Sequence, residues 1–258
     1  MEQFYSIADM IIGNGMILYG QPKWTFGKNT CNTYELFVDR VRTSQGETIP
    51  AWPIVNLIEK DPSLTMLFSN WLLWHAMEET ARLNKNLDSH LTLSLNLLPS
   101  FAESMNFVQQ VQKCLEEFNI EPKHFQFELS ESQVLTEKGI ENLNYLHDEV
   151  GIGVLLANFG TENSNVKLLR EVHFSGLELD KSYAPLVVSD EHVAKFVIAV
   201  QNMAYTMDMF VCAKGIETME QFEFFEDIGV MKGQGYLIAH PMPLDDLEDY
   251  IKKYALKR

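Results

Sequence analysis

Six polar side chains lie in or directly beside apolar segments that are predicted to be strands. They are Glu35, Asn96, Glu128, Asp180, Lys214 and Gln234. A charge in a protein core is costly unless it is paired or bound to a metal, and a hydrogen bond at a strand end would explain any one of these residues. Several of them on different strands instead indicate an active site at the open end of an α/β barrel.

The first candidates for a metal site among these residues are Glu35, Asn96 and Glu128. They offer only oxygen ligands, which suits Mg²⁺, Mn²⁺ or Ca²⁺ rather than zinc. None of the seven histidines has i,i+4 or His-x-His spacing, so we expect surface or core positions for them rather than metal ligation.

A short apolar segment, Val154–Leu156, predicts a buried strand that ends where a parallel α/β protein carries its chemistry. The next residues, Ala157 and Asn158, offer a methyl group and a neutral amide where a metalloenzyme would place carboxylates. Phe159-Gly160 then predicts a tight turn. This strand therefore does not supply the charges that its position calls for.

Strand and helix patterns alternate along the rest of the chain. The predicted strands are 16–19, 34–38, 91–97, 125–129, 154–156, 176–180, 209–213 and 235–238. Helical spacing is found in 2–12, 64–83, 107–118, 140–150, 166–172, 193–207, 219–228 and 244–254. We expect the first strand to end at Gly20-Gln21-Pro22, because proline cannot donate to a sheet, and 28–30 to form a hairpin turn. Eight strands, the last six in βα alternation, predict one closed (β/α)8-type barrel.

The length of 258 residues suits a single domain, with residues 1–13 as an N-terminal helix and 14–258 as the barrel. The net charge of −16 repels nucleic-acid backbones and anionic membranes, so neither is expected as a partner. Cys31, Cys114 and Cys212 are far apart, which indicates free thiols in a reducing compartment. Because we find no apolar run of about 18 residues and no signal sequence, we expect a soluble cytoplasmic protein.

Eight short motifs occur in a fixed order along the chain. They are Tyr19-Gly-Gln-Pro22, Tyr34-Glu-Leu-Phe37, Ser94-Leu-Asn-Leu97, Glu128-Leu-Ser-Glu-Ser132, Asn158-Phe-Gly-Thr161, Leu177-Glu-Leu-Asp-Lys181, Ala213-Lys-Gly-Ile-Glu-Thr218 and Gln234-Gly-Tyr-Leu237. In this order, from about residue 16 to residue 254, the chain resembles the EAL domain family, the bacterial cyclic di-GMP phosphodiesterases. The resemblance implies an EAL-type (β/α)8 barrel, in which the first strand is antiparallel to the others.

In active members of that family, two divalent cations activate a water that attacks one phosphodiester of cyclic di-GMP and gives linear pGpG. The resemblance carries roles over only where residues match. It implies Glu35, Asn96 and Glu128 as metal ligands, Gln234 at the metal-water site, Gln21 as a ligand contact, and Glu131, Asp180 and Glu217 as supporting or loop-anchoring carboxylates.

The chain departs from the family at the positions that carry the chemistry. The consecutive Asp pair of the family is Ala157-Asn158, the catalytic Lys is Glu178, and the Glu of the A-E-G motif is Lys214. The phosphate-contacting Arg is Asp39, with Arg40 displaced by one position, and Glu162–Asn165 replaces the usual G-Y-S-S loop.

These departures predict loss of the two-metal chemistry. Such a site needs bridging carboxylates that hold the cations roughly 3.5–4 Å apart, and Ala157-Asn158 cannot supply them. One Mg²⁺, Mn²⁺ or Ca²⁺ could still bind weakly at Glu35, Asn96 and Glu128. A reversed charge about 4 Å from a phosphate works against binding by on the order of 4 kcal/mol, so Glu178 and Asp39 disfavour cyclic di-GMP as a ligand.

We therefore expect a catalytically inactive EAL-like domain that acts through protein contacts in bacterial signalling, without a cofactor, with a protein partner of unknown identity and as a homodimer. Two alternatives remain open at this point: a cyclic di-GMP receptor without hydrolysis, favoured by Gln21 and Gln234, and a metal-dependent phosphodiesterase of weakened activity. Because the signs at Glu178 and Lys214 are reversed together, we also expect these two residues to form an ion pair across the ligand site.

Overall fold

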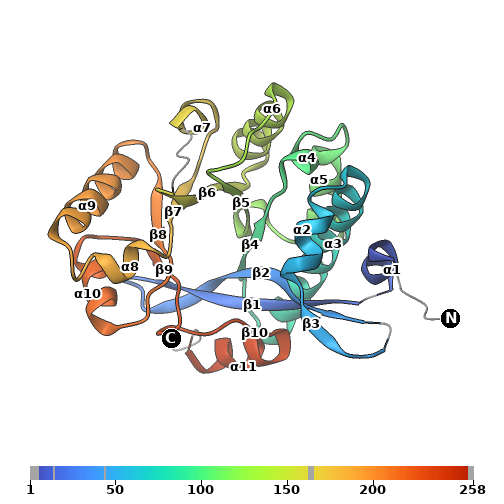
Figure 1. Cartoon of the computed structure of the whole chain (residues 1–258), viewed down its shortest axis with the longest axis horizontal. Helices are drawn as coiled ribbons and strands as arrows, with labels where there is room; N and C mark the ends of the chain where they lie inside the picture. Colours follow the sequence, from blue (N-terminus) through green and yellow to red (C-terminus); the bar gives the residue numbers. More distant parts are fainter. Residues whose placement is uncertain (1–5, 14, 44, 162–165, 255–258) are drawn as a thin grey trace.

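The computed structural model describes residues 6–13, 15–43, 45–161 and 166–254. It confirms a closed barrel of eight strands surrounded by helices (Figure 1). The barrel strands are β1 (Met16–Thr25), β2 (Thr30–Arg42), β4 (Thr92–Asn96), β5 (Phe125–Ser130), β6 (Gly153–Phe159), β7 (Gly176–Leu179), β8 (Phe210–Ala213) and β9 (Lys232–Gly233). Two short strands, β3 (Thr48–Pro50) and β10 (Met242–Pro243), extend the sheet beside β2 and β1.

The first strand runs against its neighbours, as expected. β1 is antiparallel to both β2 and β9, whereas the pairs from β2 to β9 through β4, β5, β6, β7 and β8 are parallel. The carboxyl ends of the parallel strands therefore meet at one end of the barrel, which we call the mouth, and their amino ends meet at the opposite end, the foot.

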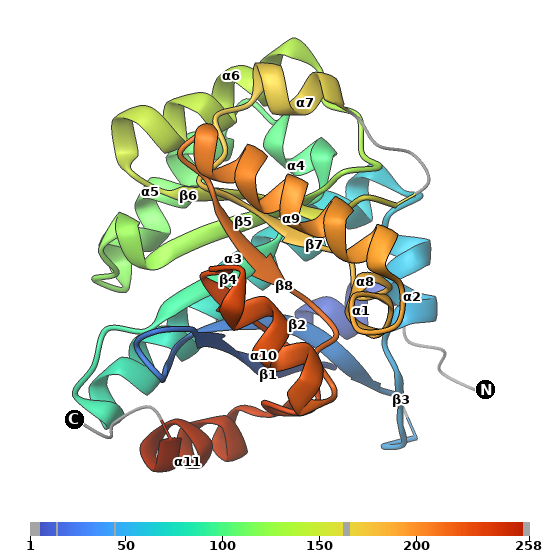
Figure 2. The same cartoon turned by 90° about the vertical axis from the view of Figure 1, so that its left-hand side faces the viewer.

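Helices follow the strands on the outside of the barrel (Figure 2). They are α1 (Ile7–Ile12), α2 (Trp52–Ile58), α3 (Pro62–Leu87), α4 (Pro99–Ala102), α5 (Phe107–Glu117), α6 (Glu137–Tyr145), α7 (Val166–Glu171), α8 (Tyr183–Leu186), α9 (Glu191–Thr206), α10 (Met219–Asp227) and α11 (Leu244–Tyr254), with the 3₁₀ turn η1 (Pro122–His124) and the π-helical turn η2 (Leu146–Val150). No helix within these described ranges is long and apolar enough to cross a bilayer.

Alternation along the strands gives the barrel an apolar outside and a polar inside. On β5, Phe125, Phe127 and Leu129 belong to the hydrophobic core around the barrel. The alternate residues Gln126 and Glu128 contact polar side chains of other strands, with the Gln126 amide donating to Ser94 at 3.0 Å. Side chains alternate with a period of two along a strand, so the polar residues of the motifs share the interior.

Two predicted strand limits are wrong. β1 continues through Pro22 to Thr25; it pairs with β10 at Tyr19 and Gly20 and with β9 at Trp24 and Thr25. Pro22 lies between these pairings, where one side of the strand has no partner, so the strand can include a residue without an N–H.

The last barrel strand ends earlier than predicted. It is Lys232–Gly233, and residues 235–238 form a turn in which the amides of Ile238 and Ala239 both donate to the carbonyl of Gly235 at 3.0 Å. A Cβ at Gly235 would lie 2.1 Å from the carbonyl oxygen of Ile216, so only glycine allows this approach.

Candidate functional site

Five charged side chains meet inside the barrel below its mouth. They are Glu35 on β2, Glu128 on β5, Glu178 on β7, Lys23 on β1 and Lys214 directly after β8. We call them the charged cluster. With three carboxylates and two ammonium groups, it carries one net negative charge when all members are ionised.

Lys23 holds the deeper half of the charged cluster. Its Nζ lies 2.5 Å from Oε1 of Glu128 and 2.6 Å from Oε1 of Glu178, and all three side chains are fully buried. It also donates to the hydroxyl of Ser94 at 3.2 Å, and that hydroxyl donates in turn to Glu128. Every hydrogen of the Lys23 ammonium thus has an acceptor, as a buried charge requires.

Lys214 holds the upper half of the charged cluster. Its Nζ lies 3.1 Å from Oε2 of Glu35, 3.0 Å from Oε2 of Glu128 and 2.8 Å from Oε2 of Glu178. The predicted ion pair between Glu178 and Lys214 is therefore confirmed, although this contact is not aligned as a hydrogen bond. The pair is not isolated, because each member also binds another charged side chain.

The two buried carboxylates respond differently to this environment. Burial would raise the pKa of Glu128, but Lys214 and Lys23 together lower the pKa of Glu128 far below its usual value. Burial and the neighbouring Glu128 raise the pKa of Glu178, against the opposing effect of the two ammonium groups. Although burial disfavours the charged form of Lys214, the three carboxylates raise the pKa of Lys214 well above its usual value.

The remaining predicted metal-site residues contact the charged cluster at Glu35. The amide of Asn96 donates to Oε1 of Glu35 at 2.8 Å, and the amide of Gln234 donates to Oε2 of Glu35 at 3.1 Å. Glu35, Asn96, Glu128 and Gln234 are thus brought together as the sequence predicts. Both amides turn their nitrogen atoms toward Glu35, so they act as donors to that carboxylate.

The predicted supporting residues lie around the mouth. Oε2 of the buried Glu131 accepts from the amide of Gly160 at 2.9 Å and so holds the loop after β6. The carboxylate of Asp180 accepts from the amide of Ser182 at 2.9 Å. The Gln21 amide donates to the carbonyl of Ala239 at 2.9 Å. Glu217 lines the cavity described next.

A cavity of about 530 Å³ opens above the charged cluster at the mouth, a size usual for small-ligand sites. Its lining includes Lys214, the exposed Lys181 and Asn158, and the exposed ring of Tyr236. Tyr236 stacks on His240, with ring centroids 4.1 Å apart. Gln21, Glu35, Asn96, Asp180, Glu217 and Gln234 complete its polar lining.

The two anions that were expected to repel a phosphate lie away from this cavity. Glu178 is fully buried beneath it and bound by Lys23 and Lys214. Asp39 is not among the cavity residues, and its carboxylate pairs with Arg40 at 3.0 Å. Each of these two carboxylates is paired with a cation at short range, so neither faces an anionic ligand as a free charge, as the sequence-based argument assumed.

The charged cluster does not fit a pair of divalent cations. The carboxylates that would ligate metal instead bind two ammonium groups at 2.5–3.1 Å. Ala157 is buried and offers no ligand, and the exposed Asn158 adopts a left-handed backbone at φ 58° after β6. To bind here, a metal would have to displace an ammonium group that is already paired with these carboxylates.

Lys23 is the residue that inspection of the motifs missed. Its position two residues after Gln21 on the same strand places both side chains on one face, and Gln21 was already assigned to the site. The spacing from Gln21 therefore indicates that Lys23 belongs to the site. A first strand that ends at Pro22, as the sequence predicted, does not include Lys23.

Residues 6–241 match the EAL domain. The chain belongs to the EAL domain family. It is 29% identical over 93% of its length to the cyclic di-GMP phosphodiesterase PA2567 of Pseudomonas aeruginosa, and 28% identical over 80% of its length to the probable cyclic di-GMP phosphodiesterase PdeN of Escherichia coli. The chain spans only 40% and 39% of the length of these two proteins.

Solved EAL structures share the fold. The EAL enzyme Bd1971, in a form with bound cAMP and cyclic di-GMP, matches 94% of this chain and 66% of its own with a TM-score of 0.86 at 23% identity. The phosphodiesterase PaMucR, in complex with cyclic di-GMP, matches 93% of this chain and 96% of its own with a TM-score of 0.82 at 24% identity.

These comparisons overturn one sequence-based expectation, namely that cyclic di-GMP is not a partner. PA2567 is named as a cyclic di-GMP phosphodiesterase, and Bd1971 and PaMucR were solved with cyclic di-GMP bound. The expectation was wrong because it treated Glu178 and Asp39 as free charges facing a ligand. The homodimer stays a prediction from the family resemblance, and the substituted loop Glu162–Asn165, in the region where that resemblance places the dimer contact, lies outside the described residues.

Proposed function

We propose that this EAL domain binds cyclic di-GMP at the barrel mouth without hydrolysing it and acts as a regulatory domain through protein contacts. The observation that carries the proposal is the position of Lys214. Its ammonium, at the floor of the mouth cavity, lies within 3.1 Å of Glu35 and Glu128, to which the family resemblance assigns metal ligation, and 2.8 Å from Glu178.

The charged cluster supports the proposed absence of hydrolysis. Cleavage by the family route needs metal-bound water, and Glu35 and Glu128 are instead neutralised by ammonium groups. A lysine ammonium cannot lower the pKa of a bound water as a divalent metal does. The raised pKa of Lys214 also keeps it protonated at neutral pH, so it cannot act as a general base.

Nucleotide binding is supported by the lining of the mouth cavity. The exposed Lys181 places a cation where a phosphate could enter, and an ammonium is a common phosphate ligand. The exposed Tyr236 offers an aromatic face for a base, and stacking on such a face contributes about 1–3 kcal/mol per base. Gln21 and Gln234 add amide groups that can bind polar edges of the ligand.

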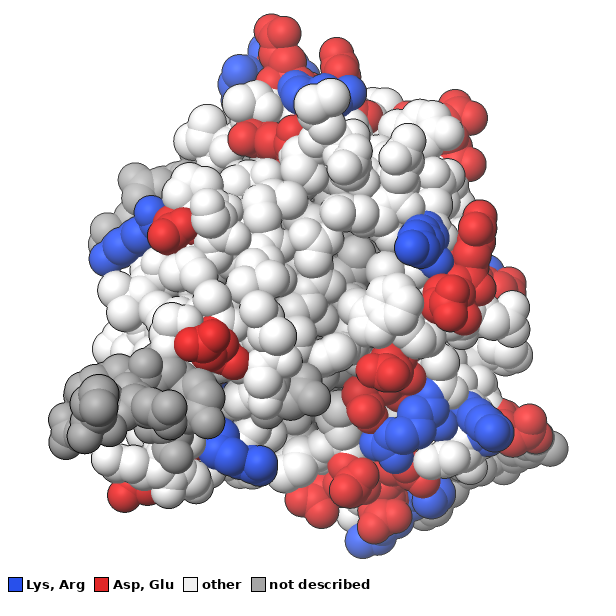
Figure 3. Space-filling view, turned by 90° about the vertical axis from the view of Figure 1, so that its right-hand side faces the viewer, with Lys and Arg blue, Asp and Glu red and all other residues white. Residues whose placement is uncertain are grey.

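A role through protein contacts is supported by one face of the molecule. On the side that carries α1, α3 and α5, a broad central area shows no charged side chain (Figure 3). The apolar lining of a groove on this side includes Ile11, Ile12, Leu67, Trp71 and Trp74, and its polar lining includes Lys113. On a chain of net charge −16, an apolar area of this kind is typical of a protein-binding surface.

Calorimetric titration with cyclic di-GMP, together with chromatography of the nucleotide after incubation with Mg²⁺ or Mn²⁺, tests the proposal. We expect saturable binding without metal and no pGpG. Lys181→Ala and Tyr236→Ala should weaken binding, each by roughly tenfold, as expected for loss of about 1.4 kcal/mol. Lys28→Ala, at an exposed lysine outside the cavity, is the matched control.

Two outcomes would contradict the proposal. Formation of pGpG that disappears in Glu35→Ala would identify a phosphodiesterase of weakened activity with a metal at the mouth. Absence of binding at millimolar nucleotide would leave protein contacts as the only function of the domain.

A further inference from the structure

Two groups of histidines and carboxylates gather at the foot of the barrel, the end opposite the mouth. One group is His90, Glu121 and His124, and the other is His147, Asp148 and His173. In each group one ligand atom per residue lies within 4.8 Å of the others. The members come from separate loops and turns, so their spacing along the sequence does not reveal them.

The second group has the closer geometry. Nδ1 of His147 lies 2.8 Å from Oδ1 of Asp148, and Nδ1 of His173 lies 3.1 Å from the same oxygen and 2.8 Å from Oδ2. Ligands of a tetrahedral zinc ion, each about 2.0–2.1 Å from the metal, lie roughly 3.3 Å from one another. The distance from each nitrogen to the carboxylate therefore needs to lengthen by only a few tenths of an ångström to accommodate an ion.

A π-helical turn and the side chain of Asn144 hold these three residues in place. His147 and Asp148 lie on η2, the π-helical turn at the end of α6; such turns often occur at functional sites. Asn144, on α6, accepts from the amide of His173 at 2.9 Å and donates to the carbonyl of Glu171 at 2.9 Å. One side chain thus fixes the loop that carries His173 against the helix that leads to the other two ligands.

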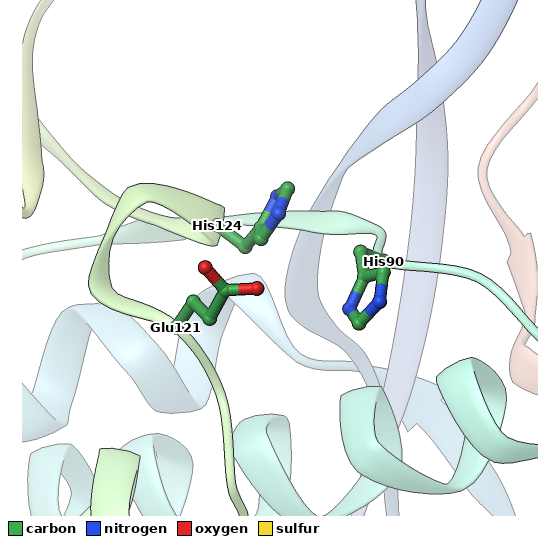
Figure 4. A group of neighbouring side chains, drawn as sticks. All are labelled: His90, Glu121 and His124. Carbon is green, nitrogen blue, oxygen red and sulfur yellow. The ribbon is translucent and has the colours of Figure 1, made fainter.

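The first group is a weaker candidate, and it supplies a control. The carboxylate of Glu121 points toward His124 and His90 (Figure 4), but it already pairs with Lys123 at 2.7 Å. The two imidazole rings are stacked with their planes 17° apart, and Nδ1 of His124 lies 3.3 Å from the hydroxyl of Thr92. A neighbouring ammonium competes with a cation for Glu121 and lowers the attraction of this group for a metal.

We propose that His147, Asp148 and His173 form a binding site for a divalent transition metal, with Zn²⁺ as the ion that suits them best. Two imidazole nitrogens and one carboxylate oxygen are a common zinc ligand set that leaves a fourth position for water. The three side chains are partly exposed, so an ion can reach them from solvent. The site is distinct from the oxygen-rich mouth and would join η2 to the loop before β7.

The bound ion would act on the structure at the foot. It would link two segments that connect α6 to β6 and α7 to β7, and a ligand that binds only the folded state raises the unfolding temperature. Binding would require each imidazole to carry its proton on Nε2, because Nδ1 must face the metal. The hydrogen bonds from both Nδ1 atoms to Asp148 would then be replaced by metal–ligand bonds.

Titration of the chelator-treated protein with Zn²⁺, followed by calorimetry and thermal melting, tests the site. We expect one tight zinc ion per chain and a higher melting temperature with the ion. His147→Gln and His173→Gln should each weaken this binding by more than about 100-fold, because loss of supporting contacts alone costs about 10–100-fold. His90→Gln and His124→Gln are the matched controls and should bind as the wild type does.

Co²⁺ provides a second readout that does not depend on stability. Its visible absorption should report nitrogen and oxygen ligation in the wild type and should be lost in His173→Gln, whose melting without metal shows whether the variant folds. Three results would each overturn the proposal. The first is that the wild-type protein binds no Zn²⁺ at a concentration on the order of 100 µM, which we take as the upper limit for a specific site. The others are full zinc binding by His173→Gln and loss of zinc binding in His90→Gln. None of these outcomes bears on cyclic di-GMP binding at the mouth.

Discussion

Nζ of Lys23 lies 2.6 Å from Oε1 of Glu178 inside the barrel, and neither side chain is exposed to solvent. The family resemblance places a lysine at position 178, on β7. In this chain the carboxylate is on β7, and β1 supplies the ammonium from the other side of the barrel. A cation is thus retained near this position, but it lies below the mouth and cannot contact a ligand.

The first prediction concerns Lys23. Lys23→Met removes the only ammonium that binds Oε1 of both Glu128 and Glu178 among the described residues. It leaves two buried carboxylates that share only Lys214. Breaking a buried ion pair by removal of one partner costs about 3–5 kcal/mol, and we expect a loss of that size in urea denaturation. Lys28→Met, at an exposed position in the hairpin turn, should change the free energy of unfolding by less than about 0.5 kcal/mol. An equal loss in both variants would contradict the importance of the charged cluster.

The second prediction concerns the ion pair between Glu178 and Lys214. For an isolated pair, Glu178→Lys and Lys214→Glu would each destabilise the protein and the double reversal would recover most of the loss. The structure changes this expectation, because Lys at 178 would meet Lys23 and Glu at 214 would meet Glu35 and Glu128. We therefore expect the double variant to be at least as unstable as either single variant. Recovery of more than half of the loss, measured by thermal and urea denaturation, would contradict this.

The barrel itself was predictable from the sequence, because the strand and helix patterns are regular and the motifs follow one order. The inward position of Glu35, Asn96 and Glu128 followed from single polar residues in apolar strands. The error at Pro22 had a physical cause: a proline ends a strand that is paired on both sides, whereas β1 is unpaired on one side at that point. Partner strands determine this, and their register cannot be obtained from local sequence.

The energetics of the charged cluster were not predictable from the motifs. Comparison position by position treats Glu178 as an anion facing a phosphate, but the barrel places two ammonium groups against it. The two histidine–carboxylate groups at the foot were not predicted either, because they also depend on contacts between segments that are far apart in the sequence. Asp148 and His173 are 25 residues apart along the chain, yet their side chains are in contact, because consecutive βα units bring their connecting loops together.

The third prediction concerns how the free energy of unfolding changes at acidic pH. The pKa of Glu128 is lowered in the folded state, so below about pH 4.5 the unfolded state takes up a proton first and stability falls as the pH falls. In Lys214→Met the carboxylate loses one of its two cations and its folded pKa rises, which reduces the difference in bound protons. We expect the decline in unfolding free energy between pH 5 and pH 3 to become shallower, by up to roughly 1.4 kcal/mol per pH unit. If the unfolding free energy of Lys214→Met instead declines in parallel with that of wild type and of Lys28→Met, Lys214 does not lower the pKa of Glu128.

The last prediction concerns Lys232 at the foot of the barrel. Its Nζ donates to the hydroxyl of Thr33 at 3.1 Å and lies 4.9 Å from the ring centre of Phe210, and no carboxylate among the described residues pairs with it. Burial and the nearby Lys23 lower the pKa of Lys232 to about 8. Because the folded pKa lies below the unfolded value of 10.5, the ammonium destabilises the folded state at pH 7, and this cost decreases as the pH rises from 8 to 10.5.

Lys232→Met should therefore raise the unfolding free energy at pH 7 by roughly 1–2 kcal/mol, after loss of the contacts with Thr33 and Phe210. Urea denaturation at pH 7 and pH 9.5 tests this, and the gain should be smaller at the higher pH. A gain that is the same at both pH values would mean that burial of the methionine side chain causes the effect, and a loss at pH 7 would mean that the contacts of Lys232 outweigh the cost of its charge.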